Sequence, residues 1–188
     1  FIYNKPLIPV HHIAGHIYAN NLVKRLTFPL IALVVSGGHT ELVYMKEDYS
    51  FKKLGGTLDD AVGEAYDKVA RVINVPYPGG PLVDKLALKG EDTYALPLPL
   101  NDDSYNFSFS GLKTATSRLV KSFDGKELPT ADICASFQEC VSETLIKKVK
   151  HALEVKGYKQ VVIAGGVAAN SEIRRKVFEL EKEGYRVN

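Results

Sequence analysis

The fold is decided by one stretch, LIALVVSGGHTELVY, which runs over Leu30–Tyr44. Its first six residues are apolar and mostly branched, which is typical of a buried strand, and the alternation after Thr40 predicts a second strand that returns beside the first. Between them, the Ser36–His39 tip carries two glycines, which free the backbone to point its amides at an anion. The stretch therefore predicts a β-hairpin whose tip is either a phosphate-binding loop or an ordinary two-glycine turn.

A second glycine pair lies far along the chain, at Gly165 and Gly166. It follows the apolar run Gln160–Ala164, typical of a buried strand, and precedes a helix that we expect to begin near Ser171. Open α/β sheets hold nucleotides where a strand, a glycine turn and a helix N-terminus meet, because the helix start offers unpaired amides. The two glycine turns together predict a clamp around a phosphate-bearing ligand.

The composition is that of an ordinary globular protein. The 188 residues are 45% hydrophobic, which is enough for one good core or two modest lobes. The formal net charge of +2 is too small to indicate nucleic acid by itself. Basic residues gather in the second half, where solvated helix faces are favoured and an RNA-binding surface stays open: Lys147, Lys148, Lys150, Arg174, Arg175 and Lys176.

The ends and the cysteines bear on location. No apolar run reaches the length of a membrane span, and Phe1–Asn4 lacks the basic-then-apolar pattern of a secretory signal. Cys134 and Cys140 fall in one predicted helix, where they do not face each other closely enough to bridge. We therefore expect reduced thiols in a soluble, cytoplasmic protein with no membrane partner. We also expect an excerpt cut at both ends, because the chain lacks an initiator Met and stops where a strand begins near Tyr185.

Three of the five histidines fall within six residues. The apolar spacing that follows predicts a helix on which His12 and His16 lie one turn apart and share a metal; a cap and a packed histidine are the alternative. A metalloprotease helix carries Glu after its first His as the general base, whereas here that position is Ile13. Spacing provides no third ligand, since His39 and His151 stand alone, and no catalytic residue is assigned.

An acidic helix follows the hairpin. Leu58–Asp60 is expected to cap a helix that runs to about residue 74, on which Asp60, Glu64 and Asp67 share one side. A solvated acidic face is the default interpretation of such spacing. The alternative is that one or more of these carboxylates reach a ribose or a metal-bound phosphate.

The remaining segments predict connections and scaffold. A third glycine pair, at 79 and 80, precedes a short helix expected over Leu82–Ala87. Residues 89–106 predict an irregular connection, and Ser110 is a plausible cap for the helix after it. An amphipathic helix is expected from Leu128 to about Val155, ending at Gly157, and its role is to support the sheet.

Six motifs stand in order along the chain: VHHIAGH at 10–16, VSGGHT at 35–40, DDAVGEAYDK at 59–68, YPGGP at 77–81, NFSFSGLKT at 106–114 and GGVAAN at 165–170. Together they resemble one family, the bacterial-type tRNA threonylcarbamoyladenosine synthases, formerly labelled O-sialoglycoprotein endopeptidases or glycoproteases. Any one motif is weak, but six that span nearly the whole chain make the resemblance highly specific.

The resemblance implies an α/β protein with the actin-like ATPase (ASKHA, ribonuclease H-like) fold of two lobes. Residues 1–28 would end the first lobe and carry the metal-binding helix, and residues 29–188 would form the second lobe, truncated at its C-terminus. The implied reaction transfers a threonylcarbamoyl group from threonylcarbamoyl-adenylate to the exocyclic amine of the adenosine beside the anticodon, in tRNAs that read codons beginning with A.

The resemblance also implies site residues and partners. His12 and His16 would hold one divalent metal ion, iron or zinc, since histidine nitrogen accommodates both. Threonylcarbamoyl-adenylate, or an adenine nucleotide, would be held by residues of the tip, the following helices and the second glycine turn: Val35, Ser36, Gly37, Gly38, His39, Asp67, Gly80, Asp84 and Asn170. The implied partners are tRNA, an inactive paralogue of the same fold and a small P-loop ATPase.

Members of the family carry a third metal ligand, an aspartate, past Asn188, and a phosphate-contacting loop before Phe1. We therefore expect this fragment to bind metal weakly and to be inactive alone. Two other classes stay open: a metallopeptidase, as the older label suggests, and a non-catalytic dimerisation partner of the same fold. The absence of the H-E-x-x-H glutamate disfavours the first, and the retained histidines disfavour the second.

Overall fold

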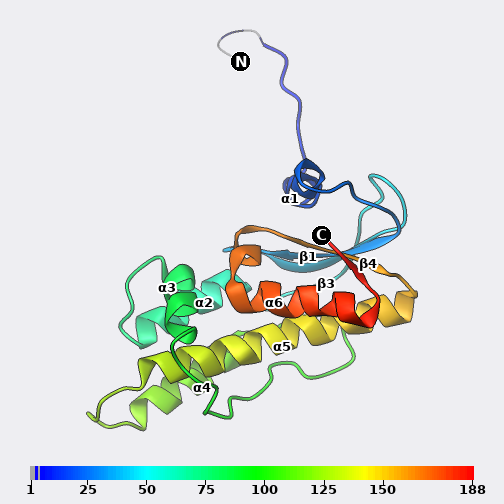
Figure 1. Ribbon diagram of the computed structural model, residues 1–188. Helices are drawn as coiled ribbons and strands as arrows, with labels where there is room; N and C mark the ends of the chain where they lie inside the picture. The colour runs from blue at the N-terminus through cyan, green and yellow to red at the C-terminus, as the bar shows by residue number, and fades with distance from the viewer. Residues whose placement is uncertain (1–2, 4) are drawn as a thin grey trace.

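A computed structural model describes Tyr3 and residues 5–188 (Figure 1). Phe1, Ile2 and Asn4, which belong to the predicted segment 1–28 and to the opening without a signal pattern, lie outside the described residues. The α-helices are α1 His12–Tyr18, α2 Val62–Val72, α3 Gly79–Ala87, α4 Ser110–Lys121, α5 Thr130–Lys156 and α6 Ser171–Glu179. The strands are β1 Leu30–Val35, β2 Thr40–Met45, β3 Lys52–Gly56, β4 Gln160–Ala164 and β5 Arg186–Val187. Short 3-10 helices are η1 Ala19–Leu22, η2 Gly166–Ala169 and η3 Leu180–Glu183.

One mixed sheet has the strand order β3-β2-β1-β4-β5. The predicted hairpin is confirmed: β1 and β2 pair antiparallel, with Leu30 opposite Met45 and Val35 opposite Thr40. β3 pairs antiparallel with β2, whereas β4 and β5 run parallel to β1. The carboxyl ends of β1 and β4 therefore lie side by side, and each leads into one of the two glycine turns.

The central strands are buried because both faces of the sheet are covered (Figure 1). Side chains alternate across β1: Ile31, Leu33 and Val35 pack with the helices α2 to α6, and Leu30, Ala32 and Val34 pack with α1. Continuous apolar runs are typical of strands buried on both faces. The period-two alternation thus divides one strand between two cores.

The long helix α5 spans the lower face of the sheet and ends at Gly157 in the left-handed conformation. Cys134 and Cys140 are buried thiols, and burial raises the pKa of each to about 12. The expectation of solvated basic side chains is wrong at Lys148, which is 2% exposed. Its ammonium donates to the Asp102 carboxylate and to the carbonyls of Asp102 and Ser104, so it fastens the 89–106 connection onto α5. No described helix has the length and apolar character needed to span a bilayer.

The predicted cap of the acidic helix is also wrong. The N-cap residue of α2 is Ala61, which makes no side-chain cap hydrogen bond. The Asp59 carboxylate instead accepts hydrogen bonds from the hydroxyls of Ser108 and Ser110 and from the amides of Phe109 and Ser110. Asp59, rather than Ser110, therefore caps α4. Burial acts to raise the pKa of Asp59, but these hydrogen bonds outweigh burial and lower the pKa below its usual value. Leu58 hydrogen-bonds to Phe107, which explains why Asp59 reaches a helix about fifty residues away.

Candidate nucleotide pocket and histidine pair

A pocket of about 340 Å³ opens where the two glycine turns meet the starts of three helices. This volume lies within the range of small-molecule sites, roughly 300–1,000 Å³. The lining comes from the hairpin tip, α2, the start of α3 and the second glycine turn (Gly165–Asn170): Gly37, Gly63, Tyr66, Asp67, Pro78, Gly80, Pro81, Asp84, Lys85, Gly166, Val167, Ala169 and Asn170. The fold therefore gathers segments more than a hundred residues apart around one cavity.

The hairpin tip packs tightly on the start of α2. The amide of Gly63 donates to the Ser36 carbonyl at 3.2 Å, and the amide of Val62 donates to the Thr40 hydroxyl at 2.8 Å. A Cβ at Gly63 would stand 2.7 Å from the Ser36 oxygen, inside van der Waals contact. Gly63 is thus required for this approach, which brings Gly37 to the pocket wall.

The second glycine turn lies against the end of β1. Gly165 has a φ of +98°, and a Cβ there would overlap the Val35 carbonyl. Such a backbone conformation strongly favours glycine. The second glycine turn therefore contacts Val35, the residue just before the Ser36–His39 tip. Asn170 ends the second turn as the N-cap of α6 by accepting from the Ile173 amide at 3.0 Å.

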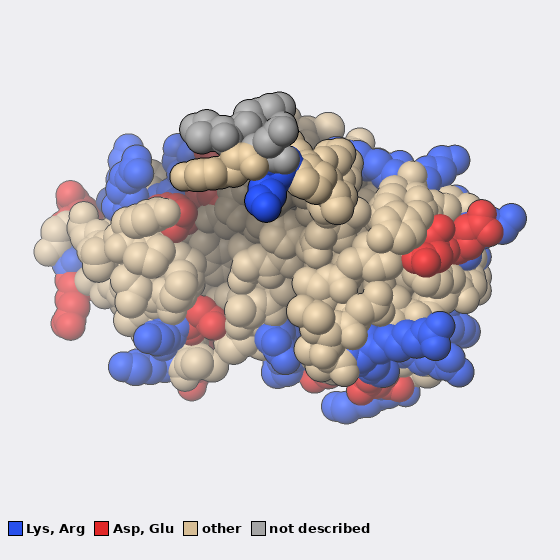
Figure 2. All heavy atoms as spheres, turned by 90° about the horizontal axis from the view of Figure 1, so that it is seen from above, with Lys and Arg blue, Asp and Glu red and all other residues tan. Residues whose placement is uncertain are grey.

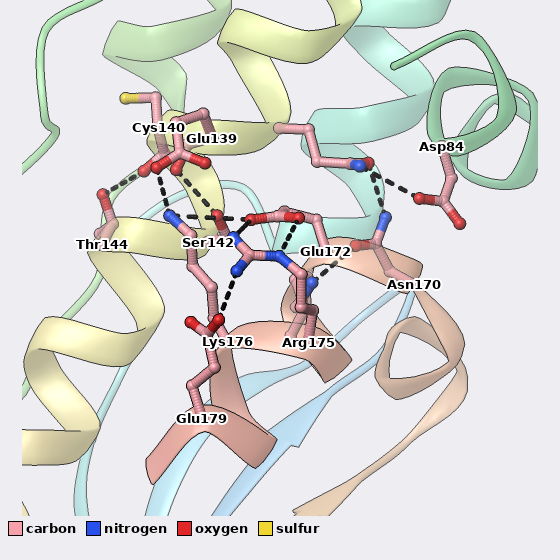
Figure 3. A network of polar contacts seen from close by, with 12 residues as sticks. Asp84, Glu139, Cys140, Ser142, Thr144, Asn170, Glu172, Arg175, Lys176 and Glu179 are labelled. Carbon is pink, nitrogen blue, oxygen red and sulfur yellow. Dashed lines mark hydrogen bonds and ion pairs between the residues drawn. The ribbon is translucent and has the colours of Figure 1, made fainter. Parts of the chain in front are cut away.

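Carboxylates join the pocket's helices to one another. The Asp67 carboxylate accepts from the Gly79 amide at 2.8 Å, linking α2 to the start of α3. The Asp84 carboxylate accepts from the Ser171 hydroxyl at 2.6 Å and from the Ser171 amide at 3.1 Å, linking α3 to α6. Gln138 of α5 donates to Asp84 as well, at 3.1 Å, and Figure 3 shows Asp84 and Asn170 within this network.

Three α-helices, α2, α3 and α6, begin at or beside the pocket. The amide end of a helix carries positive partial charge, which favours a bound anion. The first amides of these three helices already donate to protein oxygens: Val62, Gly63, Gly79 and Ser171. The Asp67 and Asp84 carboxylates accept hydrogen bonds from neutral donors. The arrangement thus offers a place for a phosphate near acceptors that suit hydroxyl groups.

Five of the predicted donor-binding residues line the pocket: Gly37, Asp67, Gly80, Asp84 and Asn170. The other four do not. Val35 is fully buried in β1, and Ser36 and His39 close the tip on itself, with the Ser36 amide 2.8 Å from the His39 carbonyl and the His39 amide 3.0 Å from the Ser36 hydroxyl. Gly38 lies within the same tip. The roles of all nine residues remain predictions.

The histidine pair, His12 and His16, lies on α1 with the two Nε2 atoms 3.2 Å apart. A tetrahedral ion with bonds of about 2.0–2.1 Å to two imidazoles holds their nitrogens about 3.3–3.4 Å apart, so the pair fits two positions of such a site. The expectation that His39 stands alone is wrong, because its ring centroid is 5.3 Å from that of His12. Within Tyr3 and residues 5–188, no group of three or more His, Cys, Asp or Glu side chains is arranged to hold a metal.

The sequence did not identify two residues of this region, Tyr66 and Gln138. Tyr66 lies inside α2 and lines the pocket, while Gln138 lies behind it on α5 and is 3% exposed. Gln138 did carry a signal: it is a polar residue between Cys134 and Val141 on the apolar side of an amphipathic helix. A polar side chain placed on such a face requires a buried partner.

Charge is dispersed over the face that carries α1. Figure 2 shows Lys and Arg side chains around the edge of this face, interrupted by acidic groups, with a hollow in neutral surface near its centre. A contiguous basic patch is the usual footprint of nucleic acid. The face in Figure 2 therefore gives no support of its own to the open RNA-binding interpretation.

Comparison with solved structures gives the fold. A crystal structure of full-length HypF superposes with a TM-score of 0.73 over 98% of this chain and 40% of that protein, at 15% identity. HypF from T. kodakarensis gives 0.65 over 85% of this chain and 31% of that protein, at 14% identity. Together with the strand order, these similarities confirm the predicted actin-like α/β fold. The division of the chain at residue 28 remains a prediction.

Comparison of sequences gives the family. Proteins named tRNA N6-adenosine threonylcarbamoyltransferase match from Staphylococcus epidermidis, 55% identical over 98% of this chain, and from Staphylococcus aureus, 57% identical over 94% of this chain. The chain spans about half the length of these curated relatives, 55% and 53% respectively. The family model for TsaD, tRNA N6-adenosine threonylcarbamoyltransferase, matches residues 1–187. The chain therefore belongs to the tRNA N6-adenosine threonylcarbamoyltransferase (TsaD) family.

Proposed function

We propose that this chain forms the donor-binding part of an enzyme that transfers a threonylcarbamoyl group from threonylcarbamoyl-adenylate to the exocyclic amine of the adenosine beside the anticodon, in tRNAs reading codons that begin with A. Family membership supports the reaction. The observation that carries the proposal is the pocket, where Gly37, Asp84 and Asn170 meet from three distant segments.

The pocket's groups suit an adenylate. A carboxylate accepts about four hydrogen bonds. Asp84 uses three of these sites for Ser171 and Gln138, which leaves one acceptor site for a ribose hydroxyl. Asp67 uses one oxygen for Gly79 and offers the other. The helix starts then lie where the phosphate would be held, and the Ser36–His39 tip would border the threonylcarbamoyl group.

The reaction depends mainly on how the donor and the attacking amine are positioned. The donor is a mixed anhydride, so the amine nitrogen forms a bond to the carbamoyl carbon while the bond from that carbon to the phosphate oxygen breaks. AMP leaves with the electron pair, and the amine loses one proton. Fixed donors that hold the leaving phosphate stabilise the charge that develops on it, and alignment of a weak amine against the carbonyl supplies much of the rate.

The histidine pair would hold one divalent ion, iron or zinc, which when bound supplies Lewis-acid chemistry at a carbonyl or phosphate oxygen. His12 and His16 provide two nitrogen ligands from one helical face. The proposal includes tRNA as substrate, an inactive paralogue of the same fold and a small P-loop ATPase as partners, and the cytoplasm as location. No further residue is assigned to catalysis.

An equilibrium titration with a non-hydrolysable threonylcarbamoyl-adenylate analogue tests the proposal. We expect saturable binding that falls about tenfold in Ser36→Ala and in Asn170→Ala, the usual cost of one or two lost hydrogen bonds. Ser122→Ala, at the end of α4 with its hydroxyl on the Leu119 carbonyl, is the matched control and should bind as the unaltered chain does. Absence of binding, or equal affinity in all four proteins, contradicts the proposal.

A further inference from the structure

One buried side chain behind the pocket contacts three of its walls. Gln138 of α5 is 3% exposed and does not line the cavity. Its amide nitrogen donates to Asp84 of α3 at 3.1 Å, and its amide oxygen accepts from the Asn170 amide at 2.8 Å. The hydroxyl of Tyr66, on α2, lies 3.3 Å from the same oxygen. A single amide therefore links the two polar groups of the pocket that come from α3 and from the start of α6.

The chemistry of the partners determines how this amide is turned. A carboxylate only accepts, so the nitrogen of Gln138 must face Asp84, and its oxygen then faces Asn170 and Tyr66. Asn170 in turn directs its own nitrogen to Gln138 and its oxygen to the Ile173 amide. Donors and acceptors alternate through the network. Reversing the side-chain amide of Gln138 or Asn170 would therefore place a donor against a donor and an acceptor against an acceptor.

Tyr66 completes the alternation. Its hydroxyl donates to Gln138 and accepts from the Asn170 amide at 3.3 Å, which requires that the hydroxyl keep its proton. Burial, followed by the nearby Asp84 and Glu172 carboxylates, raises the pKa of Tyr66 well above its usual value. The hydroxyl is therefore a donor throughout the neutral and acidic range. The described side chains include no buried polar atom without a partner, this network included.

We propose that Gln138 is a positioning residue for the adenylate: it holds the Asp84 carboxylate in place as an acceptor and Asn170 in one amide orientation, so that both meet the ligand in a preset geometry. The inference rests on the proposed function, because it concerns the ligand of the same pocket. Gln138 itself touches only protein groups, and its effect on the ligand passes through Asp84 and Asn170. A merely structural glutamine would join α3, α5 and α6 without affecting how the ligand is recognised.

Gln138→Glu separates these roles, because the charge of the introduced side chain depends on pH. When ionised, the introduced carboxylate stands against Asp84 and cannot donate to it. When protonated, the introduced carboxyl donates to Asp84 and accepts from Asn170 as the amide does, and two adjacent carboxylates that share one proton show one strongly raised pKa. Acidification therefore rebuilds the network in this variant alone.

The measurement is the affinity for the non-hydrolysable threonylcarbamoyl-adenylate analogue at pH 7.5, 6.5 and 5.5. For Gln138→Glu we expect roughly a tenfold to hundredfold loss at pH 7.5, the cost of breaking a hydrogen-bonded charge, and recovery of at least about tenfold by pH 5.5. Gln138→Leu, similar in volume but unable to hydrogen-bond, should stay weak at every pH. Gln160→Glu makes the same substitution at another buried glutamine, which is bonded to Thr27 and Asn188 away from the pocket, and should follow the unaltered chain.

Recovery in Gln138→Glu alone supports the inference. A flat profile for Gln138→Glu, or unaltered affinity at pH 7.5, overturns it while the proposed function stands. Failure of the unaltered chain to bind overturns the proposed function and this inference together. If Gln138→Glu does not fold, NMR of the unaltered chain decides: the Gln138 side-chain amide signal, identified by its loss in Gln138→Leu, should shift when the analogue is added, and an unmoved signal overturns the inference.

Discussion

The pocket and the histidine pair differ in how their side chains are held. Asp84 accepts hydrogen bonds from α5 and from the start of α6, and Asn170 bonds to α2, α5 and its own helix, so the pocket is fixed from several elements. His12 and His16 sit one turn apart on the seven-residue α1, where their rings contact each other and the His12 ring lies beside that of His39. The proposed donor pocket is thus fixed from several elements of the fold, whereas the proposed metal site depends on two histidines of one short helix.

The largest effect should come from breaking the contact between the second glycine turn and Val35 at the end of β1. Gly165→Val forces a branched residue into a φ of +98° and a Cβ into the Val35 carbonyl. We expect the free energy of unfolding to fall by roughly 3 kcal/mol, measured by urea denaturation, with loss of analogue binding. Gly184→Val is the matched control, since Gly184 has a similar φ of +86° but open space around it, and it should cost clearly less. Equal losses in the two variants would mean that the close packing of Gly165 on Val35 contributes nothing to stability.

The independence of the two sites gives the next prediction. His16→Ala removes one of the two proposed nitrogen ligands and should lower zinc affinity by about a hundredfold, since even indirect support of a ligand is worth about 10- to 100-fold. Analogue affinity should stay within about twofold, because the pocket's hydrogen bonds do not involve α1. A zinc-indicator competition assay and the analogue titration measure the two quantities. His151→Ala, whose ring packs on Tyr105, is the control, and a parallel loss of both affinities in His16→Ala would show that the sites are coupled.

The converse change lies in the pocket. Asp84→Asn keeps the shape of the side chain but directs an NH2 group at donors from Ser171 or Gln138. We expect analogue affinity to fall about 10- to 100-fold, the range for hydrogen bonds to a charged group, while zinc affinity is unchanged. Asp132→Asn makes the same change at the start of α5, where the carboxylate accepts from the Glu91 amide. If Asp84→Asn binds the analogue as tightly as Asp132→Asn does, Asp84 does not contribute to binding of the analogue.

Local patterns predicted the sheet and its two glycine turns well, because strand burial, glycine turns and helix starts depend on neighbouring residues. The hairpin, the buried strand β4 and the start of α6 at Ser171 all follow from such patterns. The long helix was also expected, and it begins two residues after the predicted start and ends one residue after the predicted end. The resemblance added the pocket residues Asp67 and Asp84, whose proximity no spacing rule indicates.

What the sequence did not predict depends on contacts between distant segments. Lys148 looks like one more basic residue on a helix, yet the 89–106 connection folds over it and supplies three acceptors. His39 is isolated in sequence and adjacent to His12 in space. Gln138 is recognisable only as a polar interruption of an apolar face, and its partners lie 32 and 54 residues away. Local periodicity carries no information on such pairings.

The smallest effect tests a region outside both sites. Asp59→Asn weakens the cap of α4 and should lower the free energy of unfolding by about 1 kcal/mol at pH 7, with analogue and zinc affinities unchanged. The direction of the pH dependence follows from the lowered pKa of Asp59 in the folded chain. Ionised Asp59 stabilises the fold at pH values above the pKa of an Asp in the unfolded chain, near 4. This stabilisation is lost as the pH falls from that value toward the lower pKa of Asp59 in the folded chain. The difference in stability between the unaltered chain and Asp59→Asn should therefore shrink between pH 6 and pH 3 in urea denaturation. Asp103→Asn, in the exposed 89–106 connection, controls for the loss of one charge. A difference that stays constant over this range would show that the Asp59 hydrogen bonds do not favour its ionised form.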